Sequence, residues 1–497
     1  MRFRLFLLIL VLFWRFATAV AAADDPALLA KAQAYEAWLR THHVPGYGGV
    51  VNVVFETPEL QNVLLYRGQG DSTMWTATYC AAESFRYAVT GEIEAKDNAV
   101  AAVHTLRDHL RVTQTPGYIG RYVGPVSDPA FWLDYVDSDL LRYGEGAWLG
   151  TFYLSNSSSD QYVGWFHGLA VAYDLIDDAP LRALIREMVA EVIDALEAHR
   201  WLILNEEGLP TTAAPGIDGS ERLTFCLIAA HILDEQYYWD LYAEQFEDAK
   251  PTLPFKSIAF WSKYTEYFAN NLRHQNHYNL FRLETDPERL AFYWDVFNKR
   301  IRRWSEWTHN VYYVFVYLSG CERGLPCAEA YEIMTDAVES LTAFQEPPNR
   351  ESHVDCPLLP VDPLSATLVE LAELLGLSDL LDFELQTAEP HEIADRCRVD
   401  FLWQRTPYHR YCIGYLDQSV FPGVDYLLAY WMGRYHGYLE PHDIVDDDTN
   451  DDDSLDDDAV DDDVDDDGAS DDDHGGDDDS ILTGDGDDDN DDRGCAC

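Results

Sequence analysis

The apolar residues of this chain recur mostly at helical rather than strand spacing. Residues 72–89 carry apolar side chains at every third or fourth position, and residues 180–196 repeat the pattern as a nearly unbroken stripe. This periodicity is typical of helices that bury one face. The full set of expected helices is 26–42, 72–89, 93–110, 160–176, 180–196, 221–233, 237–246, 258–272, 287–304, 311–318, 328–344, 365–375 and 424–435.

Short turns separate many of these helices. Asp71 or Ser72 can cap the start of one helix, Gly91 is placed to end it, and Asp178 with Pro180 signals the start of another. Each helical hairpin must bury its apolar face against a neighbour. With no exact sequence repeat and few strand signals, the pattern predicts an all-α fold, an (α/α) barrel or toroid of helical hairpins. The alternative is an irregular α-bundle.

Two local patterns depart from amphipathic helices. Residues 50–54 are rich in valine and predict a short strand. Residues 311–318 are apolar and β-branched throughout, so they fit either a buried helix or a strand.

The N-terminus has the pattern of a secretion signal. Arg2 and Arg4 precede an apolar run at 5–14, and small residues before Asp24 offer cleavage sites. Residues 1–23 are therefore predicted to be a signal peptide. The run is short for a membrane span. We expect an exported protein, either secreted or at the cell surface, with a periplasmic location as an alternative and no membrane span in the mature chain.

The sequence changes character after residue 444, which ends the predicted helical domain 24–444. Residues 445–497 consist largely of aspartate triplets, and they carry a large share of the chain's net charge of -55. Such a segment repels itself and cannot bury a core, so it is expected to be disordered. The acidic body and tail together argue against nucleic acid or an anionic membrane as a partner.

The acidic tail also suggests two properties of its own. Residues 463–468 match the start of a calcium loop but lack its final glutamate, so we expect diffuse calcium binding rather than a specific site. No other cofactor is indicated. Cys495 and Cys497 resemble the cysteine-bearing sorting tails of some exported bacterial proteins, which predicts cell-surface attachment through the tail.

The chain has nine cysteines. Cys321 and Cys327 flank a short turn and are expected to close a small loop, whereas Cys80 and Cys226 fall in helical patterns and are expected to be buried thiols. No spacing resembles a zinc site. The pairing of the loop cysteines stays open for Cys356, Cys397 and Cys412.

Candidate chemistry begins with Asp160 and His167, which lie on one line of the helix 160–176 about two turns, or roughly 10 Å, apart. Gly164 lies between them and has no side chain, so a small polar ligand would fit across the gap. The alternative is an aspartate favoured by the helix macrodipole and a histidine that belongs to the core. We expect Asp160 to act as general base or acid, with His167 assisting.

Hydrolysis of a glycosidic bond needs a second acid, for which Glu83 is the candidate. It shares the helix 72–89 with Trp75, Tyr79 and Arg86. Aromatic faces with interspersed polar groups suit sugar rings, so these three are expected to bind substrate. The alternatives are an aromatic core stripe and an ordinary Glu83–Arg86 ion pair.

Two further candidates for substrate binding are arginines. Arg121 follows Gly117 and Gly120, so a flexible loop presents its guanidinium as a clamp for a carboxylate or hydroxyls. Arg405 is a weaker candidate.

The most polar interruption of the helical pattern is residues 270–279. Because its amides, histidines and arginine cannot all face an apolar core without partners, it is either an exposed loop or the lining of a cleft. Asn276 and His277 are expected to contact substrate. His274 and His277 have metal-ligand spacing, but no third ligand is apparent, so no metal is expected.

Four groups of segments resemble the six-hairpin, or (α/α)-barrel, glycosidase-like superfamily, in its uncharacterised bacterial members. The resemblance implies a polysaccharide hydrolase or lyase with a cleft at one mouth of the barrel. By this resemblance Asp160 is expected to be an acid–base residue, but the resemblance identifies no complete catalytic pair. The segments span most of 70–436 and are 90–91 with 115–121, 159–162 with Gly164, 276–277 with 284–287, and 401–405 with 423–428.

The sequence as a whole therefore favours an exported carbohydrate-active enzyme that acts on a glycan. A non-catalytic glycan-binding or surface-displayed protein with an acidic tether is the first alternative. A structural, calcium-dependent surface protein is the second.

Overall fold

The computed structural model describes residues 22–23, 26–136, 138–256, 269–350, 359–377, 385–396, 407–408 and 418–440. These residues are mostly helical, with a few small sheets, as the periodicity predicts. The predicted signal peptide and acidic tail, apart from Ala22 and Ala23, lie outside the described residues.

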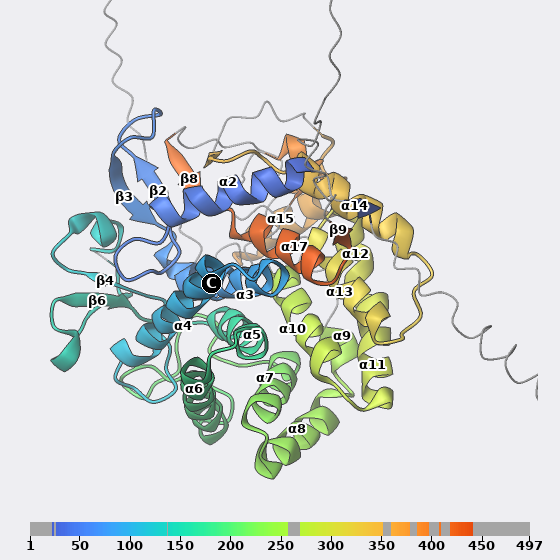
Figure 1. Ribbon diagram of the computed structural model, residues 1–497, viewed down its shortest axis with the longest axis horizontal. Helices are drawn as coiled ribbons and strands as arrows, with labels where there is room; N and C mark the ends of the chain where they lie inside the picture. The colour runs from blue at the N-terminus through green and yellow to red at the C-terminus, as the bar shows by residue number, and fades with distance from the viewer. Residues whose placement is uncertain are drawn as a thin grey trace, which may run out of the picture. The chain divides into compact units, whose positions relative to one another are not determined.

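Within the described part of the chain, six helices are buried on nearly all sides, and each packs against an amphipathic helix that buries only one face. Figure 1 shows the amphipathic partners on the outer side of the buried helices. The pairs, with the buried helix first, are α3 (Ser72–Thr90) with α4 (Ile93–Val112), α5 (Ser159–Leu175) with α6 (Ala179–Ala198), α7 (Gly219–Leu233) with α8 (Gln236–Ala249), α10 (Ala269–Leu283) with α11 (Pro287–Phe297), α13 (Val311–Glu322) with α14 (Ala330–Ala343), and α17 (Val424–Tyr435) with α2 (Pro26–His42).

The buried helices also contact one another in chain order. Helix α3 packs on α5, α5 on α7, α7 on α10, α10 on α13 and α13 on α17, and α17 in turn packs on α3. Helix α10 reaches α5 as well. The main hydrophobic core lies within and between these pairs.

Most strands belong to the segments that lead into buried helices; the exceptions are β1, which precedes α2, and β9, which follows α17. One sheet has the order β3-β2-β8-β7, a second has β4-β6-β5, and β1 pairs with β9. Remaining helical segments are short apart from α15. The bounds are β1 (Ala22–Ala23), β2 (Asn52–Phe55), β3 (Val63–Arg67), β4 (Tyr122–Pro125), β5 (Leu141–Tyr143), β6 (Thr151–Leu154), β7 (Asn349–Arg350), β8 (Ser419–Phe421), β9 (Leu439–Glu440), α9 (Leu253–Lys256), a π-helical segment (Asn298–Arg302), α12 (Arg303–Trp307) and α15 (Pro363–Leu375).

Several predicted helix ends are confirmed. Asp178 caps α6 by accepting a hydrogen bond from the Leu181 amide, and Gly91 ends α3 with a φ of 68°. Asp71 occupies the position before α3, but its side chain makes no capping hydrogen bond. Its carboxylate instead lies 4.0 Å from Arg121 Nη1 and 3.5 Å from Gln161 Nε2.

Two stretches whose structure the sequence left open are both helical. Residues 311–318 are helical, because a helix surrounded by other helices can be apolar on every side. Residues 270–279 are neither a loop nor exposed: they form most of α10, and most of their polar side chains are buried. The sheet of β4, β5 and β6 has no counterpart in the predicted helices.

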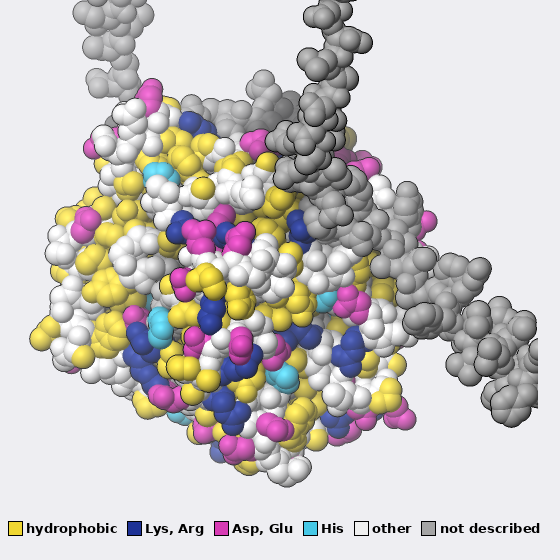
Figure 2. Space-filling view, viewed as in Figure 1, with side chains coloured by type: hydrophobic (Ala, Val, Ile, Leu, Met, Phe, Trp, Pro, Cys, Tyr) yellow, Lys and Arg dark blue, Asp and Glu magenta, His cyan; other side chains and the backbone are white. Residues whose placement is uncertain are grey.

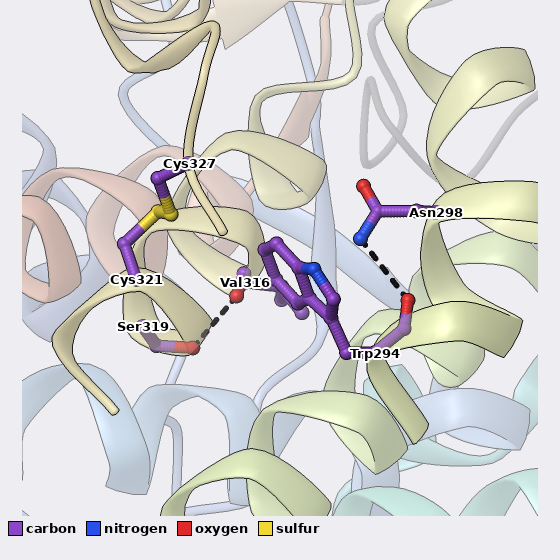
Figure 3. Close-up of a disulfide and its surroundings, with 6 residues drawn as sticks. All are labelled: Trp294, Asn298, Val316, Ser319, Cys321 and Cys327. Atoms are coloured by element: carbon purple, nitrogen blue, oxygen red, sulfur yellow. Dashed lines mark hydrogen bonds between the residues drawn. A yellow bond between two sulfur atoms is a disulfide. The ribbon is translucent and has the colours of Figure 1, made fainter. Parts of the chain in front are cut away.

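The cysteines follow the prediction where the structure describes them. Cys321, in the last turn of α13, forms a disulfide with Cys327 (Figure 3), and Cys80 and Cys226 are buried free thiols. Beside the disulfide, Gly320 lies against the ring of Trp294, where a β-carbon would come within 2.3 Å of the indole. Cys356, Cys397 and Cys412 lie outside the described residues.

No helix among the described residues is long and apolar enough to cross a membrane. On the face drawn in Figure 2, basic side chains are interspersed with acidic ones.

Two glycines of α5 set how closely it approaches α3. A β-carbon at Gly164 would lie 2.8 Å from the Met74 α-carbon, and one at Gly168 would lie 2.4 Å from the Ala77 carbonyl oxygen. Real β-carbons do not make such short contacts, so any larger residue would separate the two helices.

We predict that Gly168→Ala destabilises the fold. Overpacking costs about 1–3 kcal/mol, which outweighs the gain of about 1 kcal/mol in helix propensity. Urea unfolding of the variant should show a lower midpoint than the wild type. Gly216→Ala is the control, because its β-carbon would meet nothing within 4 Å. An unchanged or higher midpoint for Gly168→Ala would contradict the close α3–α5 contact.

Candidate functional site

The first turns of the buried helices meet through polar contacts. The Gln161 side chain of α5 accepts a hydrogen bond from the Met74 amide of α3 at 3.1 Å. The Asn310 side chain, which caps α13, donates to Asn271 of α10 at 2.7 Å. The N-terminal ends of neighbouring helices therefore lie together and bring their acidic and amide side chains to one end of the helix set.

Two carboxyl groups of unlike character lie on the adjacent helices α5 and α7. Asp160 is half-buried in the first turn of α5. Glu221 is in the first turn of α7, where its Oε2 accepts a hydrogen bond from the Asp218 amide at 2.8 Å. Burial, followed by the charges of Asp218 and Asp160, raises the pKa of Glu221 to about 8, although hydrogen bonds with the Asp218 amide and Ser159 oppose this. At neutral pH Glu221 therefore holds a proton beside a second carboxyl group.

Arg121 and Asp71 lie at the start of α3. The guanidinium of Arg121 donates to the Gly70 carbonyl at 2.8 Å and to the Asn156 carbonyl at 2.9 Å. Its Nη1 is 4.0 Å from the Asp71 carboxylate, which Gln161 Nε2 also approaches at 3.5 Å. The structure thus places Arg121 near the start of α5, as a buried link between the segments that precede α3 and α5.

Asn156 extends this link to α7. Its backbone has a φ of 54°, in the left-handed region that asparagine tolerates better than most residues. Its side-chain oxygen accepts hydrogen bonds from the Thr212 amide at 2.8 Å and the Ala213 amide at 3.4 Å. The segments before α3, α5 and α7 are therefore held together by two side chains, Arg121 and Asn156.

The predicted gap between Asp160 and His167 does not exist. Met74 of α3 occupies the space beside Gly164. His167 is buried two turns below Asp160, where the Asn279 amide nitrogen lies 3.1 Å from its Nδ1. Burial, assisted by the charge of Arg282, lowers the pKa of His167 to about 3. His167 is thus a neutral interior residue rather than a partner that meets a ligand next to Asp160.

The predicted substrate contacts on α10 are also interior. Asn276 and His277 are buried, and His277 Nδ1 donates to the Arg273 carbonyl at 2.9 Å. His274 Nε2 lies 3.0 Å from the Ser305 hydroxyl, and burial lowers the pKa of both histidines, to about 3 for His274 and about 4 for His277. No group of metal-ligating side chains occurs among the described residues.

Glu83 is not the second acid beside Asp160. It lies nine residues beyond Met74, roughly 13 Å farther along α3, and it faces α2 and α4 rather than α5. The Asn98 amide donates to Glu83 at 2.8 Å, and Arg86 pairs with it at 3.2 Å. Burial, followed by the charge of Glu36, raises the pKa of Glu83 well above its ordinary value. The group forms a buried ion cluster, and Arg86 belongs to it.

Trp75 and Tyr79 belong to the core. Their exposed fractions are 3% and 4%, and the Tyr79 hydroxyl donates to Glu36 at 2.7 Å. These two aromatic side chains therefore pack in the core, which was the alternative to sugar binding. Arg405 lies outside the described residues, so its predicted role remains a prediction.

Glu221 is the residue that the sequence analysis missed. Its helix was predicted to begin at that position, but the carboxyl group was given no role. A usable signal was present, because acidic residues recur at the starts of buried helices: Asp71, Asp160, Asp218 with Glu221, and Asp425.

Comparison with known proteins adds little. No family model matches the sequence, and no curated protein matches it. One solved structure with a similar chain course is a metagenome-derived glycoside hydrolase family 9 endoglucanase, with a TM-score of 0.40 and 12% identity over 82% of this chain and 81% of that chain. Another is a family 9 protein of Bacteroides ovatus, with a TM-score of 0.40 and 10% identity over 83% of each chain. Similarity at this level assigns no activity to this chain.

We predict that Glu221→Gln changes stability in a pH-dependent way. A folded-state pKa of about 8, against an ordinary 4.5, means that Glu221 stabilises the fold fully below pH 4.5 and loses that contribution as pH rises to about 8. Glutamine imitates the protonated form and can still accept from the Asp218 amide. The melting temperature of the variant minus that of the wild type should therefore increase between pH 4.5 and 8.

The matched control for this measurement is Glu288→Gln, an exposed acid in the first turn of α11. Its difference from the wild type should stay flat over the same pH range. A flat difference for Glu221→Gln as well would contradict the raised pKa.

Proposed function

We propose that this chain is an exported carbohydrate-active enzyme of the glycoside hydrolase type. In this proposal the six helix pairs form an (α/α) barrel, and the N-terminal ends of the buried helices form the mouth that receives a glycan. The cyclic order of helix contacts supports the barrel. The observation that carries the activity is the pair Asp160 and Glu221, two half-buried carboxyl groups on adjacent helices, of which Glu221 has a raised pKa.

The proposed reaction uses each carboxyl group once. Glu221, protonated at neutral pH, donates its proton to the oxygen of the leaving sugar. In this proposal Asp160 acts as a carboxylate, the form that the positive end of the α5 dipole favours. It either activates a water molecule or attacks the sugar carbon itself, and the separation of the two groups around the bound sugar decides between these routes.

The positions of the histidines favour hydrolysis over elimination. A polysaccharide lyase of this superfamily would use a histidine or tyrosine as its base. His167 is enclosed two turns below Asp160, and His277 bonds to its own helix and stacks near Phe297. Neither has access to a substrate at the N-terminal ends of the helices, whereas Asp160 is partly exposed.

Arg121 is assigned a positioning role in this proposal rather than a clamp for substrate. Two of its hydrogen bonds go to backbone carbonyls that flank α3 and α5, and it approaches the Asp71 carboxylate. It fixes the segment that leads into Asp160, so its effect on the reaction passes through that segment.

Export and surface attachment rest on the sequence of the chain ends, and diffuse calcium binding rests on the acidic tail. The Cys321–Cys327 disulfide supports export, because disulfides persist mainly in oxidising compartments. The second candidate function is glycan binding without catalysis. It is favoured by the capping box of Asp218 and Glu221, which gives Glu221 a structural reason to be present.

The direct test uses a panel of polysaccharides and measures new reducing ends. Wild-type protein should release them from at least one member of the panel, and Asp160→Asn and Glu221→Gln should each slow release by roughly 10²–10⁴-fold. Both variants should keep a cooperative thermal transition. Glu288→Gln should act like the wild type. Retained turnover in Asp160→Asn would defeat the assignment, and glycan retention without cleavage by the wild type would favour the binding protein.

The pH profile tests the role of Glu221 separately. A proton donor must be protonated, so the rate on the cleaved polysaccharide should fall as pH rises through about 8. Initial rates at low substrate concentration between pH 5 and 10 would show this limb. A rate that rises through pH 8 would mean that Glu221 is not the donor.

A further inference from the structure

A small cavity lies at the other end of the buried helices, away from Asp160 and Glu221. It has a volume of about 230 Å³ and is lined from the last turns of α3, α5, α10 and α17. The side chains that matter for binding are Phe85, Asp174, Tyr278, Arg282 and Tyr435. None of them has a part in the function proposed above.

One wall of this cavity is polar. Asp174 pairs with Arg282, and its other oxygen lies 2.8 Å from Nε2 of His231. Arg282 also donates from Nη2 to the Asn279 side-chain oxygen at 3.1 Å. The Nε–H of Arg282 is buried and finds no acceptor among the described residues. Because this nitrogen has almost no accessible surface, a molecule in the cavity would instead meet the exposed parts of Arg282 and Asp174, whose side chains are 19% and 24% exposed.

The facing wall is aromatic. The rings of Phe85 and Tyr435 lie 5.1 Å apart between centroids, and those of Phe85 and Tyr278 lie 6.0 Å apart. The Tyr435 side chain is 39% exposed, so the cavity can be reached from solvent along this ring. Flat aromatic faces next to a hydrogen-bonding pair suit a molecule with both C–H faces and hydroxyl groups.

The charges around the cavity disfavour an ionic ligand. Asp174 neutralises Arg282. Glu322 is also near the aromatic lining, because His436 connects the two. Its Nδ1 lies 2.8 Å from Glu322, and its Nε2 lies 3.1 Å from the Tyr278 hydroxyl. An anion would meet the carboxylates of Asp174 and Glu322, and the Arg282 guanidinium is already paired with Asp174. A cation would compete for an aspartate that already has two partners.

We propose that this cavity binds one neutral sugar ring, with hydroxyl groups on the accessible parts of Asp174 and Arg282 and a C–H face on Tyr435. The volume supports a single ring, since it is below the roughly 300–1,000 Å³ of sites for drug-sized ligands. The site is independent of the proposed hydrolysis, because it uses the C-terminal ends of the helices and none of the acid–base residues.

The test is saturation-transfer NMR and calorimetry with free neutral monosaccharides, namely glucose, galactose, mannose and xylose, with glucuronate and glucosamine as charged comparisons. Wild-type protein should bind at least one neutral sugar and neither charged one. Tyr435→Ala should weaken this binding about tenfold, and Asp174→Asn should weaken it further. Because Tyr435 is partly exposed, its variant is expected to fold even where Asp174→Asn does not.

The control is Tyr237→Ala, an exposed tyrosine on α8 that should leave sugar binding unchanged. Asp160→Asn should also leave it unchanged, which separates this site from the proposed active site. The proposal is overturned by the absence of binding to every neutral sugar, by preference for a charged sugar, or by loss of binding in Asp160→Asn but not in Tyr435→Ala.

Discussion

The contact between α3 and α5 is the constraint on which the candidate site depends. Gly164 and Gly168 let the two helix backbones approach so closely that a β-carbon at either position would overlap Met74 or Ala77. At this distance Gln161 reaches the backbone at the start of α3. The first turns of both helices are thereby fixed, and Asp160 with them. Wider packing would leave the position of Asp160 to loops alone.

The fold must also provide hydrogen-bond partners for the polar side chains of helix α10. Its amides and histidines lie among buried helices, where an unpaired polar group is costly. Three of them are paired across helix boundaries: Gln275 reaches Thr78 of α3 at 3.4 Å, Asn279 reaches His167 of α5, and Asn271 accepts from Asn310 of α13. Such pairs fix which helices are neighbours, because a different arrangement would leave these groups without partners.

Much of the helical architecture follows from periodicity, while the site does not. Amphipathic stretches such as 180–196 reveal their helices directly, but α10 was unclear, since its partners lie on helices far away in the sequence. Asp160 was found because a carboxyl group at a helix start is visible in the chain. Glu221 was missed, because its raised pKa arises from burial and from carboxylates of a different segment. The sequence analysis predicted open space beside Gly164, but Met74 of α3 fills that space.

The central claim is that Glu221 carries a proton at neutral pH beside Asp160. The most direct measurement is a titration of its side-chain carboxyl carbon by NMR in protein labelled at glutamate, with the resonance assigned by its loss in Glu221→Gln. The account predicts a midpoint of about 8. It also predicts that Asp160→Asn lowers this midpoint, because that substitution removes a nearby negative charge. A midpoint near the ordinary 4.5, unmoved by Asp160→Asn, would contradict the account.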